Sequence, residues 1–405
     1  GTDTEVAAKL LGKIVDAVIA ETGGPDLFEA VRRLGRMLEG AFTILAIDCR
    51  QPGVVVGARH DSPLVVGLGE GENYLGSDVA AFVAYTRTAM EIDQDQAVMI
   101  SAGGVTVTDF DGNVVEDPTV FEVDWDASAA EKGGWDSFMD KEIHEEPAAV
   151  QRTLIGRLDD TGSINLDEVR IDEHDFTMID KIIVIGCGTA SYAGLVAKYA
   201  IEHWVRIPVE VELAHEFRYR DPILTPRTLV VAISQSGETM DTLMALRHAR
   251  EQGSKVLAIC NTQGASIPRE ADAVLYTHAG PEVAVASTKA FVAQITATYV
   301  LGLYLAQLKG TVFRDEIRQT LDSLKAMPAK IQWVLDTQPD RVQRAAEQLQ
   351  DAQSFLFLGR HVGYPVALEG ALKLKEIAYT FTEGFAAGEL KHGPIALVDE
   401  GEPVV

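Results

Sequence analysis

The sequence predicts an α/β protein in which two doubly wound parallel domains, the second incomplete, follow an antiparallel α+β region. From about residue 178, apolar runs alternate with glycine-rich or hydroxyl-rich turns and with helices, which is typical of a parallel sheet covered on both faces. The same opening, an apolar run that ends in glycine before a helix, occurs at 182–186 and again at 355–359. Before residue 125, short apolar runs and turns such as Asp111-Gly-Asn113 indicate an antiparallel sheet with a flanking helix.

These patterns divide the chain into four segments. Residues 1–125 form the α+β region, 126–165 a linker and a connector helix, 166–328 the first α/β domain and 329–405 the incomplete second one. Strands are expected in the α+β region at 42–47, 54–58, 63–67, 96–100 and 105–108. In the first α/β domain they are expected at 181–186, 209–213, 228–233, 255–260 and 273–277. Ligands of such a domain bind beyond the carboxyl ends of its strands.

Composition excludes several classes of function. The 405 residues carry a formal net charge of −26, which opposes approach to nucleic acid or to an anionic membrane. The apolar window 292–308 contains glutamines and threonines, so we expect a buried core helix rather than a membrane span. Cys49, Cys187 and Cys260 show no paired spacing, and the histidines show no metal-ligand spacing. We therefore expect a cytoplasmic protein without a disulfide framework or a metal.

The strongest chemical signal is the turn Ser234-Gln-Ser-Gly-Glu-Thr239, which follows an apolar strand. Its hydroxyl groups, a glycine that permits close approach, and the start of the next helix together suit a phosphate monoester. The alternative is a serine or threonine N-cap that binds no ligand, with Glu238 completing a capping box. A second hydroxyl-bearing helix start occurs at 285–290, where Ser287 or Thr288 would cap the helix or reach a sugar hydroxyl.

The first turn, Gly186-Cys-Gly-Thr-Ala-Ser191, resembles part of a dinucleotide fingerprint, but a serine stands at the position of its third glycine. Glu212, at the end of the next strand, would be the acidic ribose partner in that alternative. Tight strand-to-helix turns need glycine in any case, so the signal for a nicotinamide cofactor is weak.

A charged face follows in the helix expected at 364–379. Glu369, Lys373 and Glu376 recur at spacings that place them on one side of this otherwise apolar helix, whereas Lys375 points elsewhere. A solvated salt-bridge face is the ordinary explanation, but the apolar remainder favours a face that lines a cleft. There a carboxylate and an ammonium group could exchange protons with a substrate. His392, in a glycine-bounded loop, is a candidate acid or base, although a surface histidine is the default.

Four motifs together resemble one family. They are Ser234-Gln-Ser-Gly-Glu-Thr239, Glu282-Val-Ala-Val-Ala-Ser-Thr-Lys-Ala-Phe291, Ala367-Leu-Glu-Gly-Ala-Leu-Lys-Leu-Lys-Glu376 and Gly388-Glu-Leu-Lys-His-Gly-Pro394. In this order they resemble the glutamine–fructose-6-phosphate aminotransferases (isomerising), also called glucosamine-6-phosphate synthases. The resemblance implies an N-terminal-nucleophile glutaminase domain, here partial, followed by two sugar-isomerase (SIS) domains. It implies transfer of ammonia from glutamine to fructose 6-phosphate, which gives glucosamine 6-phosphate and glutamate, without a cofactor and in a homodimer.

The resemblance also implies roles for single residues. Ser234, Gln235, Ser236 and Thr239 would hold the phosphate with Thr189 beside them, and Val285 and Ser287 would face the sugar. Glu376 would be the base that moves a proton between C1 and C2, Lys373 its partner and Glu369 a supporting residue. His392 would open the ring from across the dimer interface, and Asp3 would contact the amino group of glutamine.

Three departures qualify this resemblance. Ala190 stands where relatives commonly have serine. The cysteine nucleophile and the C-terminal tail with its Schiff-base lysine have no counterpart in the sequence, which looks cut at both ends. We therefore expect that the segment alone neither hydrolyses glutamine nor completes amination. Two alternatives remain: a sugar-phosphate-binding SIS regulator without catalysis, and a phosphosugar isomerase without amination.

Overall fold

The computed structural model describes residues 2–123, 131–158, 162–166, 169–399, 401 and 403–405. The chain divides into two compact units, Gly1–Glu131 and Lys132–Val405. Residues 126–130 and 159–161 of the expected linker and connector segment lie outside the described residues, and the four segment limits derived from the sequence remain predictions.

The first unit has two antiparallel sheets with the strand orders β1-β2-β6-β7 and β4-β3-β5-β8. Its elements are α1 (Asp3–Thr22), α2 (Leu27–Gly35), β1 (Phe42–Ala46), β2 (Val54–His60), β3 (Val65–Leu68), β4 (Asn73–Gly76), η1 (Val79–Ala81), β5 (Thr88–Glu91), β6 (Gln96–Ser101), β7 (Gly104–Asp109) and β8 (Val120–Glu122). One buried cluster, which includes Val66, Ile92 and Val98, joins the two sheets. A second cluster, which includes Val18, Leu34 and Val56, packs α1 and α2 on the first sheet. The expected antiparallel α+β character is thus confirmed.

The second unit contains a five-stranded parallel sheet with the order β10-β9-β11-β12-β13. Its elements up to the end of this sheet are α3 (Phe138–His144), α4 (Glu146–Leu154), α5 (Glu173–Met178), β9 (Lys181–Gly186), α6 (Thr189–Val205), β10 (Val209–Leu213), α7 (Ala214–Arg220), β11 (Thr228–Ser234), α8 (Met240–Glu251), β12 (Lys255–Cys260), α9 (Ser266–Glu270) and β13 (Ala273–Tyr276). Every residue of β11 is buried, as expected for a central strand that is covered on both faces.

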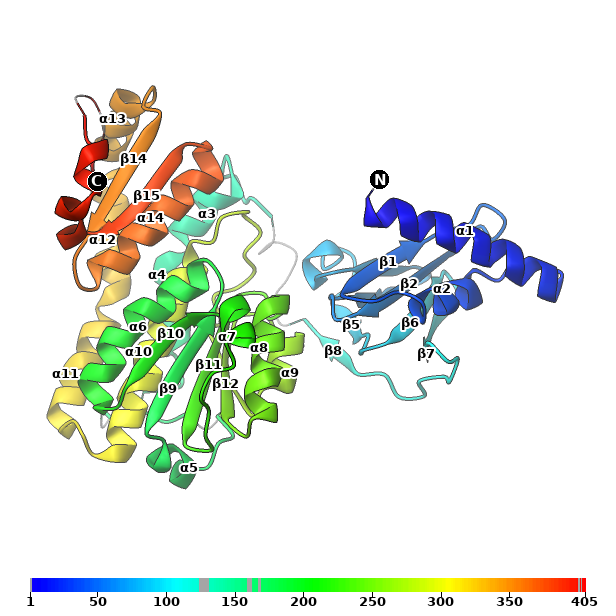
Figure 1. Cartoon of the computed structure of the whole chain (residues 1–405), viewed down its shortest axis with the longest axis horizontal. Coiled ribbons are helices and arrows are strands. Elements are labelled where there is room, and N and C mark those ends of the chain that lie inside the picture. The colour runs from blue at the N-terminus through cyan, green and yellow to red at the C-terminus, as the bar shows by residue number, and fades with distance from the viewer. Residues whose placement is uncertain (1, 124–130, 159–161, 167–168, 400, 402) are drawn as a thin grey trace. The chain divides into compact units, whose positions relative to one another are not determined.

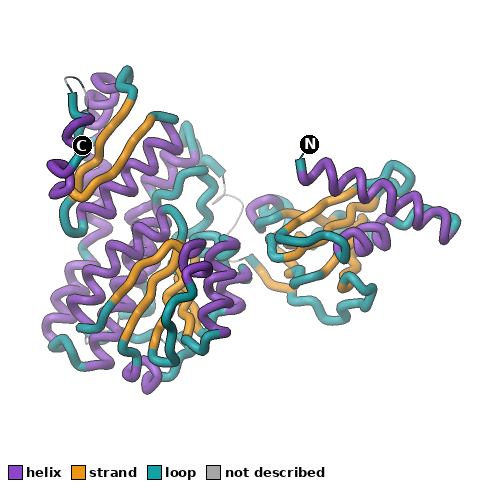
Figure 2. The backbone as a smooth tube through the Cα atoms, in the orientation of Figure 1, coloured by secondary structure: helices purple, strands orange, loops and turns teal. Residues whose placement is uncertain are grey.

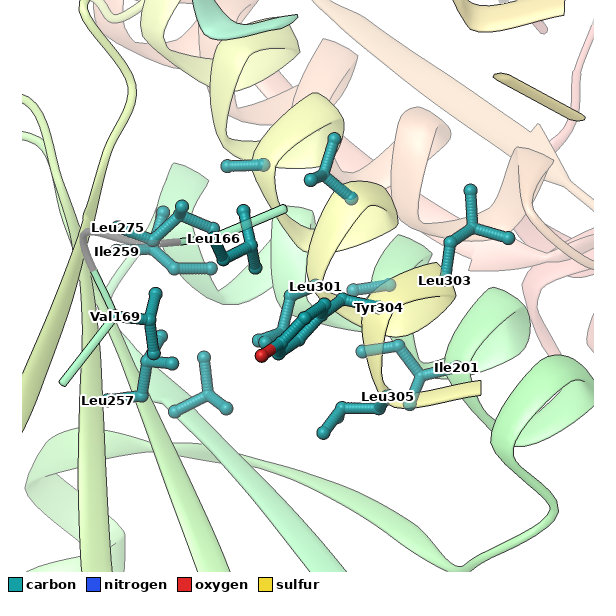
Figure 3. Packing of buried hydrophobic residues seen from close by; sticks show 14 of the residues in the cluster. Leu166, Val169, Ile201, Leu257, Ile259, Leu275, Leu301, Leu303, Tyr304 and Leu305 are labelled. Atoms are coloured by element: carbon teal, nitrogen blue, oxygen red, sulfur yellow. The ribbon is translucent and has the colours of Figure 1, made fainter. Parts of the chain in front are cut away.

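Helices cover both faces of this sheet (Figures 1 and 2). On one face, α6 and α10 (Lys289–Lys309) enclose a large apolar cluster, part of which Figure 3 shows around Leu257, Leu301 and Tyr304. On the other face, Phe217 of α7 and Leu243 and Leu246 of α8 pack against the sheet. The window expected to form a core helix lies in α10, which is long and apolar enough to cross a membrane but has 67% of that window buried inside the unit. The prediction of a core helix is therefore confirmed.

The strand order contains one reversal that positions the site. From β9 the chain moves outward to β10, then returns past β9 to β11 and continues to β13. The connections that follow β9 and β11 therefore leave the sheet on opposite sides, which opens a crevice at the carboxyl ends of these two adjacent strands.

The rest of the second unit repeats the strand-to-helix opening. It comprises α11 (Arg314–Lys325), α12 (Met327–Thr337), α13 (Pro339–Leu349), β14 (Ser354–Gly359), α14 (Gly363–Ala378), β15 (Phe381–Ala386), η3 (Ala387–His392) and η4 (Pro394–Leu397). Strands β14 and β15 are parallel, and Val404 pairs with Leu356 as a parallel bridge. Figure 1 shows α14 packed beside these two strands. The expected second α/β element is therefore present.

Several elements differ from the sequence expectations. The first unit has a second helix, α2, and three strands that were not expected, β4, β5 and β8. The connector expected as one helix within 126–165 is two helices, α3 and α4, which meet at Glu145 just before Pro147. Proline at the start of a helix has no N–H to donate backward, so it suits a new helix start better than an uninterrupted one.

Candidate functional site

A cavity of about 150 Å³ lies at the crevice between the ends of β9 and β11. It is lined by Cys187, Thr189, Ala190, Ile233, Ser234, Gln235, Ser236, Thr239, Ser287 and Gln294. The residues come from the turns after β9 and β11, from the segment before α10, and from α10 itself. Six residues that the resemblance assigned to substrate therefore meet in one place, although they are separated by up to about a hundred positions in the sequence.

The turn after β11 presents hydroxyl groups and a helix start to this cavity. Thr239 is the N-cap of α8, yet its side chain makes no capping bond to the helix. The first-turn N–H groups of an α-helix have no partner within the helix and form its positive end. The structure thus provides donors for an anion without any cationic side chain in the cavity lining.

Hydrogen bonds inside the turn fix its shape. The Ser234 hydroxyl lies 3.0 Å from the Thr239 hydroxyl and accepts a 3.0 Å bond from the Gly237 N–H. Gly237 has a φ of +69°, which favours glycine. A Cβ at this position would lie 2.6 Å from Cβ of Ala265 and 2.8 Å from Sγ of Cys260. Both the backbone conformation and the close packing therefore require glycine here.

The capping-box alternative for this turn is wrong. A capping box needs the glutamate side chain to reach back to the N-cap N–H. The Glu238 carboxylate instead accepts a 2.8 Å bond from the N–H of Ser266, in α9. The helix start is left without a side-chain cap.

Of the two alternatives for Ser287 and Thr288, capping of α10 by either side chain is not what the structure shows: Thr288 is the N-cap residue, but its side chain makes no capping bond. Oε1 of Glu282 accepts bonds from the N–H groups of Thr288 and Ala290, at 2.9 and 3.1 Å. Oε2 of the same carboxylate accepts a 2.9 Å bond from the Ser287 hydroxyl. A residue that precedes the helix by several positions therefore caps it, and Ser287 is held at the edge of the cavity.

The connector helices α3 and α4 hold the β13–α10 loop (residues 277–288), which carries Glu282 and Ser287. Glu142 of α3 is 2% exposed, and its Oε1 accepts bonds of 2.7 and 3.0 Å from the N–H groups of Val283 and Ala284. At the start of α10, Lys289 is 1% exposed and forms a 2.5 Å ion pair with Glu145. Buried charges that are paired in this way fix the geometry of the groups around them.

Burial shifts the pKa values of two carboxyl groups beside this loop. Burial raises the pKa of Glu142, although the N–H groups of Val283 and Ala284 oppose the shift. Burial and, to a smaller extent, the nearby Glu282 raise the pKa of Glu146 to about 7. Burial and a neighbouring negative charge each disfavour the charged form of a carboxyl group.

The charged face of α14 meets the cavity through Thr189. The Thr189 hydroxyl donates a 3.0 Å bond to Oε1 of Glu369 and accepts a 3.1 Å bond from the Lys373 ammonium. That ammonium lies 3.3 Å from Oε1 of Glu369 and 2.7 Å from Oε2 of Glu376. The prediction that these three residues share one face that is not simply solvated is confirmed, since Glu369 is 6% exposed.

The two carboxyl groups of this network differ in their exposure to solvent. Burial raises the pKa of Glu369, while the Lys373 ammonium and the Thr189 hydroxyl oppose that shift. Glu376 is one turn further along α14, with 33% of its side chain exposed and the ammonium beside it. A carboxylate that is held by a cation and is accessible at the same time can accept a proton from a ligand.

Four other residues that the sequence singled out do not line the cavity. Val285 is 98% exposed, and Asp3 is the first residue of α1 in the other unit. His392 ends η3 on the exposed surface. Glu212, the ribose partner of the dinucleotide alternative, forms a 2.9 Å bond with Nε of Arg220, so its carboxylate is already engaged. The roles of Val285, Asp3 and His392 stay predictions.

Sequence reasoning missed Gln294, which lines the cavity from α10 and is 2% exposed. The available signal was an amide inside an apolar helix, seven residues after Ser287. No group of three or more His, Cys, Asp or Glu side chains is arranged to hold a metal ion in the described ranges.

Comparisons with known proteins agree with this geometry. The model of the SIS domain matches residues 176–304 and 348–405. The chain is 65% identical over 403 residues to glutamine–fructose-6-phosphate aminotransferase (isomerising) of Corynebacterium diphtheriae, and 62% identical over 404 residues to that of Streptomyces coelicolor. Both matches cover 100% of this chain and 64% of the relative's length.

Solved structures give the same picture. The C-terminal domain of glucosamine-fructose-6-phosphate aminotransferase from Francisella tularensis matches with a TM-score of 0.65 and 41% identity, over 68% of this chain and 76% of that one. Glucosamine-6-phosphate deaminase from Thermotoga maritima, at 22% identity and a TM-score of 0.51 over 66% of this chain and 76% of that one, shares the fold alone. The predicted SIS fold is thus confirmed, and the chain belongs to the family of glutamine–fructose-6-phosphate aminotransferases (isomerising).

Proposed function

We propose that the protein to which this chain belongs converts fructose 6-phosphate and glutamine to glucosamine 6-phosphate and glutamate. The observation that carries the proposal is the hydroxyl-lined cavity beside α8, joined through Thr189 to the Glu369–Lys373–Glu376 network. A phosphate monoester would take the hydroxyl groups of Ser234, Ser236 and Thr239 and the N–H groups of the first turn of α8. The chain spans 64% of the length of the curated relatives cited above, so the complete reaction is proposed for the whole protein.

The network on α14 supplies the proton chemistry in this proposal. A shift between a ketose and an aldose moves a proton from one carbon to its neighbour, which requires one base that is accessible to both carbons. Glu376 would accept the proton as a carboxylate and return it to the adjacent carbon. Lys373 would hold Glu376 through their 2.7 Å ion pair and would face the sugar oxygens. Buried Glu369 and Thr189 would hold the ammonium in position.

Several finer assignments belong to the same proposal. Residues 1–125 would be part of the glutaminase domain, with Asp3 contacting the amino group of glutamine. Val285 would face the sugar, and His392 would act from the partner subunit of a homodimer. The free thiols of Cys49, Cys187 and Cys260 support a cytoplasmic location.

The test is a kinetic comparison in the whole protein. In the Glu376→Gln variant we expect a loss of fructose 6-phosphate turnover of at least about a hundredfold, with binding retained, because the amide keeps the shape but not the basicity. Glu383→Gln, on the exposed position 383 of β15, is the matched control and should behave as wild type. Turnover that survives in Glu376→Gln would refute the assignment of the base. Binding without any turnover in the wild type would favour the regulator alternative.

A further inference from the structure

Gln294 is a polar residue in a helix that otherwise builds the core. It lies on α10, whose commonest buried residues are alanine and leucine. Its side chain is not on the outer surface, since the residue is 2% exposed. It lines the same cavity as Thr189, Ser234 and Ser287. Gln294 therefore borders the candidate sugar-phosphate site.

The amide oxygen of Gln294 is unsatisfied. Its Oε1 is buried and has no hydrogen-bond partner in the part of the chain that the structure describes. Buried polar side-chain atoms in folded proteins nearly always have a partner, so an exception at a cavity wall indicates a group that a ligand or water completes.

Other polar residues of α10 show the contrast. Gln307 uses both ends of its amide, accepting a 3.0 Å bond from the Ile164 N–H and donating a 2.9 Å bond to the Ile164 carbonyl. Thr296 and Thr298 each donate to a backbone carbonyl one turn earlier. These three side chains have structural partners, whereas Oε1 of Gln294 has none among the described residues.

The chemistry of the amide indicates which part of a sugar phosphate it would meet. An amide oxygen accepts hydrogen bonds. The phosphate group of a sugar phosphate, as the dianion of a monoester, has no hydrogen to donate. A sugar hydroxyl can donate to the amide oxygen, and it can also accept from the amide nitrogen. The hydroxyl groups and helix start around 234–239 already form a cradle suited to the phosphate.

We propose that Gln294 is a substrate-binding residue whose side-chain amide hydrogen-bonds a hydroxyl group of the sugar. This inference rests on the proposed function, because it requires a sugar phosphate in the cavity. It adds one residue for sugar recognition, which lies on the helix α10 rather than on the turns that follow the strands.

The experiment is calorimetric titration of the whole protein with fructose 6-phosphate and, separately, with inorganic phosphate. Gln294→Met keeps the length of the side chain and removes both polar ends. We expect its dissociation constant for fructose 6-phosphate to rise about 2- to 13-fold, the range for one neutral hydrogen bond. Its affinity for inorganic phosphate should not change. Gln307→Met is the matched control: it should lower the melting temperature and leave both affinities unchanged.

The possible results separate the two proposals. Unchanged binding of fructose 6-phosphate by Gln294→Met, in a protein whose wild type binds it, would overturn the role of Gln294 and leave the proposed function intact. An equal loss for fructose 6-phosphate and inorganic phosphate would also overturn it, since the amide would then act on the phosphate end. A wild type that binds no fructose 6-phosphate would overturn the proposed function itself. If Gln294→Met does not fold, Gln294→Leu provides the same comparison.

Discussion

Replacing Gly237 with alanine tests whether the turn after β11 is a rigid cradle. Two costs add at this position. A φ of +69° disfavours any residue with a Cβ, by about 1–2 kcal/mol. The new methyl group would also lie 2.6 Å from Cβ of Ala265 and 2.8 Å from Sγ of Cys260. Neither neighbour is the end of a flexible side chain, so overpacking adds about 1–3 kcal/mol.

Gly253 is the matched control because it isolates the first cost. It follows the other end of α8 with a φ of +85°, and a Cβ there would meet nothing within 4 Å. Gly253→Ala should therefore destabilise the unit by only about 1–2 kcal/mol. Gly237→Ala should destabilise it by about 2–5 kcal/mol, and it should also weaken phosphate binding because the turn must shift.

The assay is urea unfolding followed by tryptophan fluorescence, since Trp204 packs against the core of the second unit. Titration with inorganic phosphate follows under conditions where each variant is folded. Equal destabilisation by the two substitutions would refute the packing argument. Unchanged phosphate affinity in Gly237→Ala would refute the claim that this turn holds the anion.

Two further predictions concern the connector helices. For Glu146, whose pKa is raised to about 7, the folded state binds the proton more tightly than the unfolded state. The free energy of unfolding should therefore fall as pH rises from about 4.5 through 7, by at most about 3 kcal/mol. Urea titrations at pH 5 and pH 8 should show a smaller fall for Glu146→Gln than for the wild type. An unchanged pH dependence in this variant would contradict the assignment to Glu146. Glu142→Ala leaves the N–H groups of Val283 and Ala284 without their acceptor and should cost about 2–4 kcal/mol together with weaker binding of fructose 6-phosphate. Glu142→Gln retains an acceptor oxygen and should restore most of both losses, so a glutamine variant as defective as alanine would show that the charge rather than the bonds matters.

The parallel sheet was the most predictable part of the fold. Strands β9, β10 and β12 have the same limits in the sequence expectation and in the structure. A strand covered on both faces is a continuous apolar run, and that signal is local. The missed strands β4, β5 and β8 have three or four residues each, and none has an apolar run of comparable length. Their pairing is decided by neighbours that are distant in sequence.

The site was predictable where its residues form local motifs. The turn at 234–239 and the face of Glu369, Lys373 and Glu376 both follow from spacing within one element. The caps were not predictable in this way, because Glu282 and Glu238 reach groups that the loop geometry brings to them. Gln294 was missed for the same reason, because its amide reaches the cavity only through the packing of α10 beside the crevice.

A crystal structure of the chain with fructose 6-phosphate would test the proposed binding site most directly. We expect the phosphate oxygens within hydrogen-bond distance of the Ser236 and Thr239 hydroxyl groups and the start of α8, with the sugar extending toward Thr189 and Glu376. A sugar phosphate bound elsewhere, or bound in the cavity with its phosphate away from α8, would contradict the proposed site.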